Sequence, residues 1–157
     1  MKTTKILGLL LVIVVLGASG LALAADTVTQ TVTIQVDPVN DISVSGDPAP
    51  LIVTAGGAPA TDSSTSYDLT TNGVALKITG EIDTDVPADT TLTVDLTAPT
   101  GATSLGPTLL STTPADLVTG IGTVAETALG ITYEFSALVT AGAVGTETRT
   151  VTFTITN

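Results

Sequence analysis

Residues 27–36, TVTQTVTIQV, alternate strictly between two rows of side chains. One row is apolar except for a single glutamine, and it consists of Val28, Gln30, Val32, Ile34 and Val36. Successive side chains of a strand point to opposite faces, so this alternation of β-branched residues is typical of a half-buried β-strand. Pro38 follows, and proline cannot donate to a strand ladder. The sequence therefore predicts a strand over residues 27–36, which we call the arm; its apolar row is the arm row.

The remainder of the chain repeats this pattern in short runs between clusters of Gly, Pro, Asp and Asn, without an amphipathic helical period. Such runs predict an all-β protein, an antiparallel β-sandwich of the Ig-like or jelly-roll kind. Disorder is excluded because 43% of the residues are hydrophobic and they are patterned. The predicted strands cover residues 42–44, 51–54, 67–71, 74–82, 92–96, 116–121, 129–139 and 149–156, with loops at 55–64 and 98–114.

A β-hairpin is predicted around Asn72-Gly73, because a two-residue type I′ turn needs positive φ at both central positions. The turn would set Leu69 opposite Leu76 and Tyr67 opposite Ile78 on one face. On the other face Asp68 would lie opposite Lys77 as a cross-strand ion pair.

Residues 1–24 have the composition of a signal peptide. Lys2 and Lys5 precede an apolar run over residues 6–16, and Ala22-Leu23-Ala24 is a small-residue cleavage site. A helical signal segment followed by a single secreted domain, residues 25–157, is therefore expected, with membrane contact only during export. The alternative is an uncleaved anchor helix, since residues 6–25 are close to the ~20 residues that span a bilayer. We expect no sorting motif after the last predicted strand.

The charge balance excludes several partners. Residues 25–157 hold fifteen acidic and two basic side chains, a net charge of −13. Nucleic-acid binding needs clustered Lys and Arg to neutralise phosphate, so we expect none. The chain has no cysteine, so the fold must be held by packing and backbone pairing.

The residue inventory argues against an enzyme and against a cofactor. With no His and no Cys, the usual nucleophilic triads and zinc ligand sets are absent. Calcium is the one candidate metal, because it binds carboxylate oxygens. Asp83, Asp85 and Asp89 could supply such oxygens, since they closely follow the end of a predicted strand. These aspartates lack the spacing of an EF-hand loop, and aspartates are also common in turns because they bond nearby backbone amides.

The arm would be free at the start of the exported chain, and two pairings are open to it. It could be the first strand of its own sandwich, or it could add to the sheet of a second copy. If it adds to a second copy, we expect the arm row to fill a groove beside the last strand, whose inward residues are Val151, Phe153 and Ile155.

The arm, the exported single sandwich, the acidic surface and the lack of catalytic groups resemble β-sandwich subunits of extracellular fibres, namely TasA-type biofilm fibres and archaeal bundling pili. The resemblance implies a homopolymeric filament in which the N-terminal strand of one subunit completes the sandwich of the next. The alternative function is a monomeric adhesion or binding module of the cell surface or matrix, stabilised by calcium.

Overall fold

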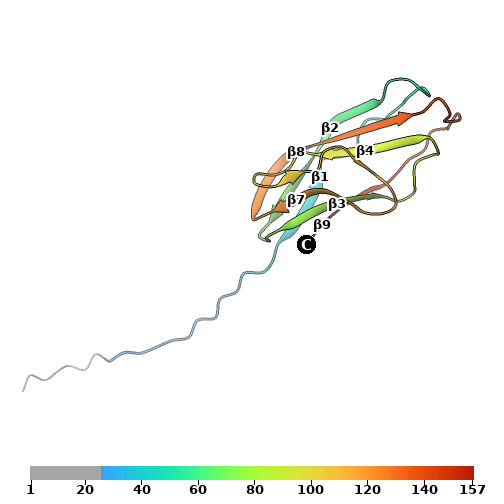
Figure 1. Cartoon of the computed structure of the whole chain (residues 1–157). Coiled ribbons are helices and arrows are strands. Elements are labelled where there is room, and N and C mark those ends of the chain that lie inside the picture. The colour runs from blue at the N-terminus through green and yellow to red at the C-terminus, as the bar shows by residue number, and fades with distance from the viewer. Residues whose placement is uncertain (1–25) are drawn as a thin grey trace, which may run out of the picture. The chain divides into compact units, whose positions relative to one another are not determined.

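The computed structural model of the chain describes residues 26–157, and these contain strands and loops but no helix (Figure 1). Residues 26–35 belong to one unit and residues 36–157 to a second, compact unit, which we call the body. The predicted signal peptide, residues 1–24, lies outside the described residues.

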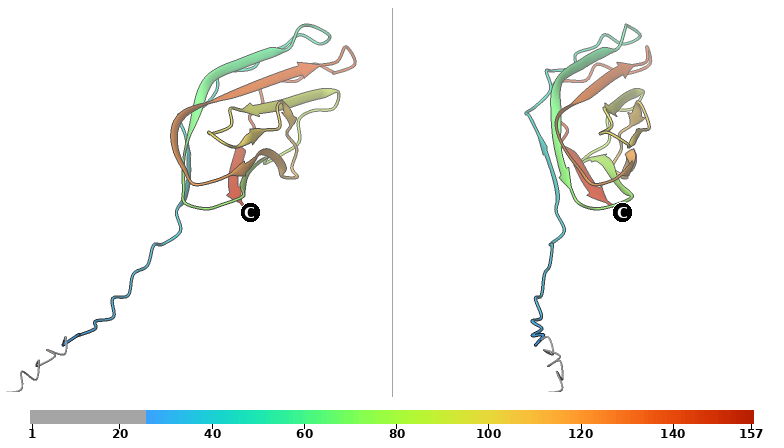
Figure 2. Two further views of the ribbon diagram at one scale, coloured as in Figure 1. Left: turned by 60° about the vertical axis from the view of Figure 1, so that its left-hand side comes forward. Right: turned by 90° about the vertical axis from the view of Figure 1, so that its left-hand side faces the viewer.

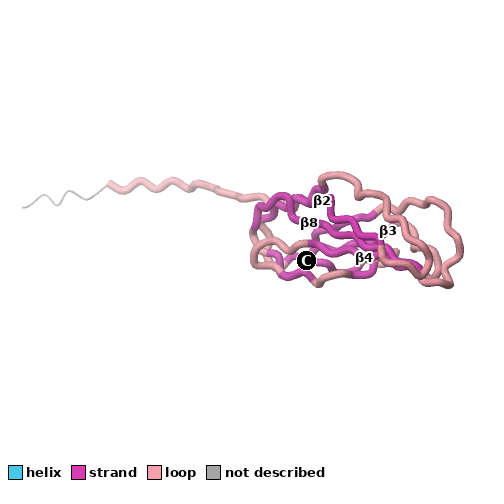
Figure 3. Tube along the Cα trace, turned by 90° about the horizontal axis from the view of Figure 1, so that it is seen from above, coloured by secondary structure: helices cyan, strands magenta, loops and turns pink. Residues whose placement is uncertain are grey.

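The body consists of two antiparallel sheets (Figure 3). The strands are β1 (Asn40–Val44), β2 (Ala60–Thr71), β3 (Leu76–Ile82), β4 (Thr90–Leu96), β5 (Thr103–Ser104), β6 (Thr108–Leu109), β7 (Ala115–Ile121), β8 (Val124–Ala137) and β9 (Val151–Thr156). One sheet has the order β1-β2-β8-β4-β6 and the other β5-β7-β3-β9. The predicted all-β, sandwich-like class is confirmed.

The core is formed mainly by inward rows of side chains from the long strands, although in β7 the consecutive residues Leu117 and Val118 are both buried. In β3 every second residue is buried, and in β4 Leu92, Val94 and Leu96 are buried while their neighbours are not. The buried apolar side chains are Tyr67, Leu69, Leu76, Ile78, Ile82, Leu92, Val94, Leu96, Leu110, Leu117, Val118, Ile121, Ile131 and Tyr133. Period-two alternation in the sequence thus corresponds to alternation between core and surface.

Strands β2 and β8 curve strongly along their length (Figure 2). Their pairing is interrupted by two register shifts, one of them between Tyr67 and Leu69. At this shift Ala128 takes a positive φ of 58°, and its amide donates to the Asp68 carboxylate at 2.8 Å. An extra residue in one strand of a pair bends the sheet locally, which accounts for the curvature.

The predicted hairpin at Asn72-Gly73 is wrong. Strand β2 pairs with β1 and β8, whereas β3 belongs to the other sheet and pairs with β7 and β9. Leu69 and Leu76 are both buried, but they come from opposite sheets. Lys77 forms its ion pair with Asp116 at 2.9 Å and not with Asp68. Two strands with apolar inward rows can pair within one sheet, or they can face each other across the core from two sheets. The alternation of side chains alone therefore could not distinguish a hairpin from two facing strands.

Asn72 has a different role from the one the turn motif predicted. Gly73 does not have a positive φ, so the type I′ turn is absent; Ala75 has one instead, at 55°. The Asn72 side chain accepts from the amide of Val39 at 2.8 Å and donates to the carbonyl of Asp37 at 2.9 Å. It therefore fixes the chain segment that leads into β1.

Apart from residues 51–54 and the arm, the other strand predictions are correct in position with shifted ends. Residues 51–54 form no strand, β2 starts within the predicted loop at Ala60, and the predicted loop 98–114 contains the short strands β5 and β6. Residues 26–39 contain no strand in the single chain. A strand is defined by ladder hydrogen bonds to a neighbouring strand, so alternation alone does not make a segment a strand.

Replacing Asn72 by alanine removes both hydrogen bonds to the segment before β1. Each exposed neutral hydrogen bond contributes about 0.5–1.5 kcal/mol, so the free energy of unfolding should fall by about 1–2 kcal/mol in urea titrations. Thr70→Ala is the matched control, because Thr70 is exposed in the adjacent strand. Equal stability of Asn72→Ala and the control would contradict this role for Asn72.

Candidate functional site

A groove of about 500 Å³ opens between strands β1 and β9. Among the described strands β1 pairs only with β2 and β9 only with β3, so each is the edge of its sheet. The two edges leave one side of the sandwich open between them. The groove is lined by Ile42, Ser43, Val44, Gly46, Asp47, Pro48, Thr65, Ile131, Tyr133, Arg149, Thr150, Val151, Thr152 and Phe153. We call it the β1–β9 groove.

The predicted inward residues of the last strand lie on this side of the sandwich. Val151 and Phe153 line the groove, and Ile155 lies further along the same face of β9. All three are only half-buried, although they pack against the core. The row is thus partly open to solvent, unlike the rows of β3 and β4.

The wall opposite β9 carries two hydroxyl groups. Tyr133 is 6% exposed, and burial raises the pKa of its phenol to about 12, with the negative charge of Asp47 as a smaller cause. Thr65 is also 6% exposed, and its Oγ1 has no hydrogen-bond partner within residues 26–157. Tyr133 lies within the strand predicted over residues 129–139. Thr65 was missed, although extending the inward row of β2 back from Tyr67 by two residues would have found it.

The start of β9 is tied to the loop that follows β3. The Arg149 guanidinium donates twice to the Asp85 carbonyl, at 3.2 and 3.1 Å, and pairs with Glu147. The Thr150 amide donates to the Asp83 carboxylate at 3.0 Å. These contacts hold the groove end of β9 in place.

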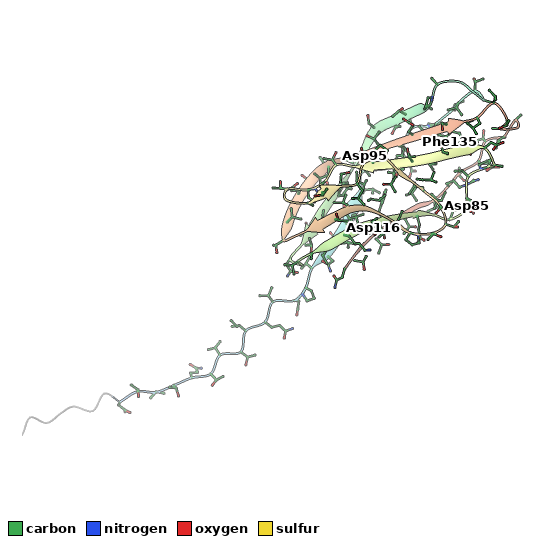
Figure 4. All side chains as sticks on the ribbon, in the orientation of Figure 1. Asp85, Asp95, Asp116 and Phe135 are labelled. Carbon is green, nitrogen blue, oxygen red and sulfur yellow. The ribbon has the colours of Figure 1, made fainter. Side chains whose placement is uncertain are left out.

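The three candidate calcium ligands do not converge. Asp83 accepts from Thr150 as described, Asp85 accepts from the amide of Thr112 at 3.0 Å, and Asp89 has a positive φ of 61° in a turn. No group of three or more acidic side chains suited to a metal occurs in residues 26–157. Figure 4 shows Asp85, Asp95 and Asp116 well apart on different elements. Asp83 and Asp85 thus bond backbone amides of segments distant in the sequence, and not the nearby amides that the turn interpretation predicted.

The arm row is exposed. Val28, Val32, Ile34 and Val36 have exposed fractions of 89, 71, 88 and 86%, and Gln30 is exposed as well. Single exposed apolar residues are ordinary, but a regular row of four within nine residues is the kind of surface that binds a partner.

Comparison of the chain with protein-family models, with curated proteins and with solved structures finds no match. In the part of the chain that the structure describes, none of the segments is a helix able to cross a bilayer.

Both tyrosines of the chain should ionise near pH 12 in the folded protein, as followed by the ultraviolet absorbance of tyrosinate. Burial raises the pKa of Tyr67 and of Tyr133 from 10 to about 12. The unfolded chain releases these protons near pH 10, so their contribution to stability is complete below pH 10 and is lost as the pH rises towards 12. Tyr133→Phe should make that loss smaller. Ionisation of both phenols near pH 10 in the folded state would contradict the burial argument.

Proposed function

We propose that this chain is the secreted subunit of an extracellular homopolymeric filament, in which the arm of one copy adds to the sandwich of the next beside β9. The observation that carries the proposal is the presence in one chain of an exposed apolar arm row and of an open β1–β9 groove. The body would be an Ig-like or jelly-roll sandwich that lacks one strand, and the signal-peptide helix would direct export. No catalysis and no cofactor are needed for this function.

The spacing of the two surfaces is complementary. Inward residues of adjacent strands repeat every two residues, or about 6.6 Å, so the arm row matches Val151, Phe153 and Ile155 of β9. Burying one Val or Ile side chain contributes about 1.5–3 kcal/mol, and the arm row offers four of them. The free backbone edge of β9 supplies hydrogen-bonding groups for a further strand. These terms together offset the ordering of the arm and the loss of translational freedom.

Charge also favours the arm as the inserted segment. The arm contains no charged residue, whereas residues 25–157 carry a net charge of −13. Two acidic bodies repel each other at short range, and salt screens this repulsion only beyond about a Debye length. An uncharged arm can enter the groove of another copy without adding to the repulsion.

Strand direction favours a second copy over the same copy. Thr71 at the end of β2 pairs with Asn40 at the start of β1, and Lys77 at the start of β3 pairs with Thr156 at the end of β9. The start of β1 and the end of β9 are therefore at the same end of the body. An arm folded back beside its own β9 would have to run parallel to it, whereas an arm from another copy can pair antiparallel. Antiparallel pairing is slightly more stable per residue.

Strand donation is a head-to-tail contact, because the donating and accepting surfaces are different. Such contacts continue into a filament unless the rotation between copies closes a ring. The same logic explains how a small domain without cysteine could form a durable structure, since each copy would be completed by its neighbour.

Ile34→Asp should abolish filaments of the purified mature protein in electron micrographs, while the secreted amount stays unchanged. The substitution would place an unpaired charge in the groove, which costs far more than the lost apolar contact. Thr33→Asp is the matched control: it adds the same charge one residue away, on the opposite row of the arm.

Loss of filaments in both variants would show that added charge alone prevents assembly and would contradict the role of the arm row. Wild-type protein that stays a compact monomer at high concentration, with its arm protected from proteases, would favour pairing within one copy. The function would then be that of a monomeric adhesion or binding module.

A further inference from the structure

The body contains two buried threonines, and they differ in one respect. Thr71 is 2% exposed; its hydroxyl donates to the Asn40 side chain at 2.6 Å and accepts from the amide of Gly73 at 2.9 Å. Thr65 lies six residues earlier on the same inward row of β2, and within the described chain its hydroxyl has no partner. Buried polar groups in folded proteins are nearly always paired, so an unpaired one calls for a specific explanation.

The Tyr133 hydroxyl lies in the same groove. Thr65 pairs with Ile131 across β2 and β8, and Tyr133 lies two residues from Ile131 on the same inward face of β8, beside a register shift in the β2–β8 pairing. No hydrogen bond of the Tyr133 hydroxyl occurs among residues 26–157, whereas the Tyr67 hydroxyl donates to the Thr97 carbonyl at 2.6 Å. The groove is thus lined by the unpaired hydroxyl of Thr65 and by the phenol of Tyr133.

We infer that Gln30 of the arm sets the register of assembly, by placing its carboxamide against the hydroxyls of Thr65 and Tyr133 in the β1–β9 groove of the next copy. The inference rests on the proposed function. A glutamine side chain has one oxygen that accepts and one nitrogen that donates, so it can satisfy two hydroxyl groups at once. The other members of the arm row are Val and Ile, and they can satisfy neither.

A residue that fixes the register is needed because the other members of the arm row are all Val or Ile. Sliding the arm by two residues replaces one Val or Ile by another and keeps the same face inward. Such a slip would bring Val28 or Val32 over the two hydroxyls and offer neither of them a hydrogen-bond partner. An apolar residue over an unsatisfied hydroxyl weakens binding, so only one register satisfies both the apolar and the polar part of the groove. A buried asparagine selects register in coiled coils in the same way.

Gln30→Met provides the first test, since methionine has a similar length and makes the arm row fully apolar. If apolar burial alone drove assembly, this variant would form filaments at a lower protein concentration than the wild type. We expect the opposite, a rise of about tenfold in the critical concentration, measured by sedimentation. Thr31→Val is the matched control, because it removes a polar group from the opposite row and should leave the critical concentration unchanged.

The effect of Gln30→Met should depend on the two hydroxyls. In a body that carries Thr65→Val and Tyr133→Phe, which preserve shape, Gln30→Met should no longer raise the critical concentration. An unchanged tenfold rise in that background would show that Gln30 acts elsewhere and would overturn the inference. A critical concentration for Gln30→Met equal to or below that of the wild type would overturn it as well.

Disulfide cross-linking separates failure of this inference from failure of the proposed function, because the chain has no cysteine of its own. A variant with Gln30→Cys and Thr65→Cys should give, after mild oxidation, a ladder of covalent oligomers on a denaturing gel. The pair Val32→Cys and Thr65→Cys should give far fewer cross-links. A ladder from the second pair only would overturn the register and leave the filament standing. A cross-linked monomer from the first pair would overturn both, since the arm would then occupy its own groove.

Discussion

The burial of one row from each strand between the two sheets is the constraint on which this domain depends. The chain has no cysteine, so no disulfide supports the fold, and apolar packing and backbone pairing carry its stability. Ile78, Val94 and Val118 are fully buried, and they come from three strands in both sheets. A polar residue in such a row must find a partner inside the protein, because water cannot reach it.

The same constraint explains why the side of the body between β1 and β9 carries the candidate site. Where the inward rows are covered from both sheets, they are fully buried. Along β9 the row is only half-buried, because β9 is an edge strand and the facing edge β1 does not cover it. Val151 and Phe153 therefore pack on the core and still line an open groove. The open groove results from the strand order, since no single residue creates it.

The sequence predicted those features that depend on the period of the side chains alone. The all-β class, the inward rows of β4 and β9, and the apolar row of the arm follow directly from alternation. Strand partners did not follow, because alternation does not say which sheet a strand joins: Leu69 and Leu76 match across the core as well as they would in a hairpin. The hydroxyl pair of Thr65 and Tyr133 could not be found either, since their proximity depends on the pairing of β2 with β8.

Polar side chains that hydrogen-bond across strands fix the register in this chain, whereas rows of apolar residues supply the buried area. Rows of Val, Ile and Leu pack well in several registers that differ by two residues. In the body, the bond between Thr71 and Asn40 ties β1 to one position along β2, and Asp68 fixes the irregular turn at Ala128 in β8. Each is a hydrogen bond that a slipped register would break. The arm has one polar residue in its apolar row, and the groove is lined by the unpaired hydroxyl of Thr65 and the phenol of Tyr133. If a hydrogen bond fixes the register of the donated strand as it does in the body, the Gln30 carboxamide sets the position of the arm of one copy along the groove of the next.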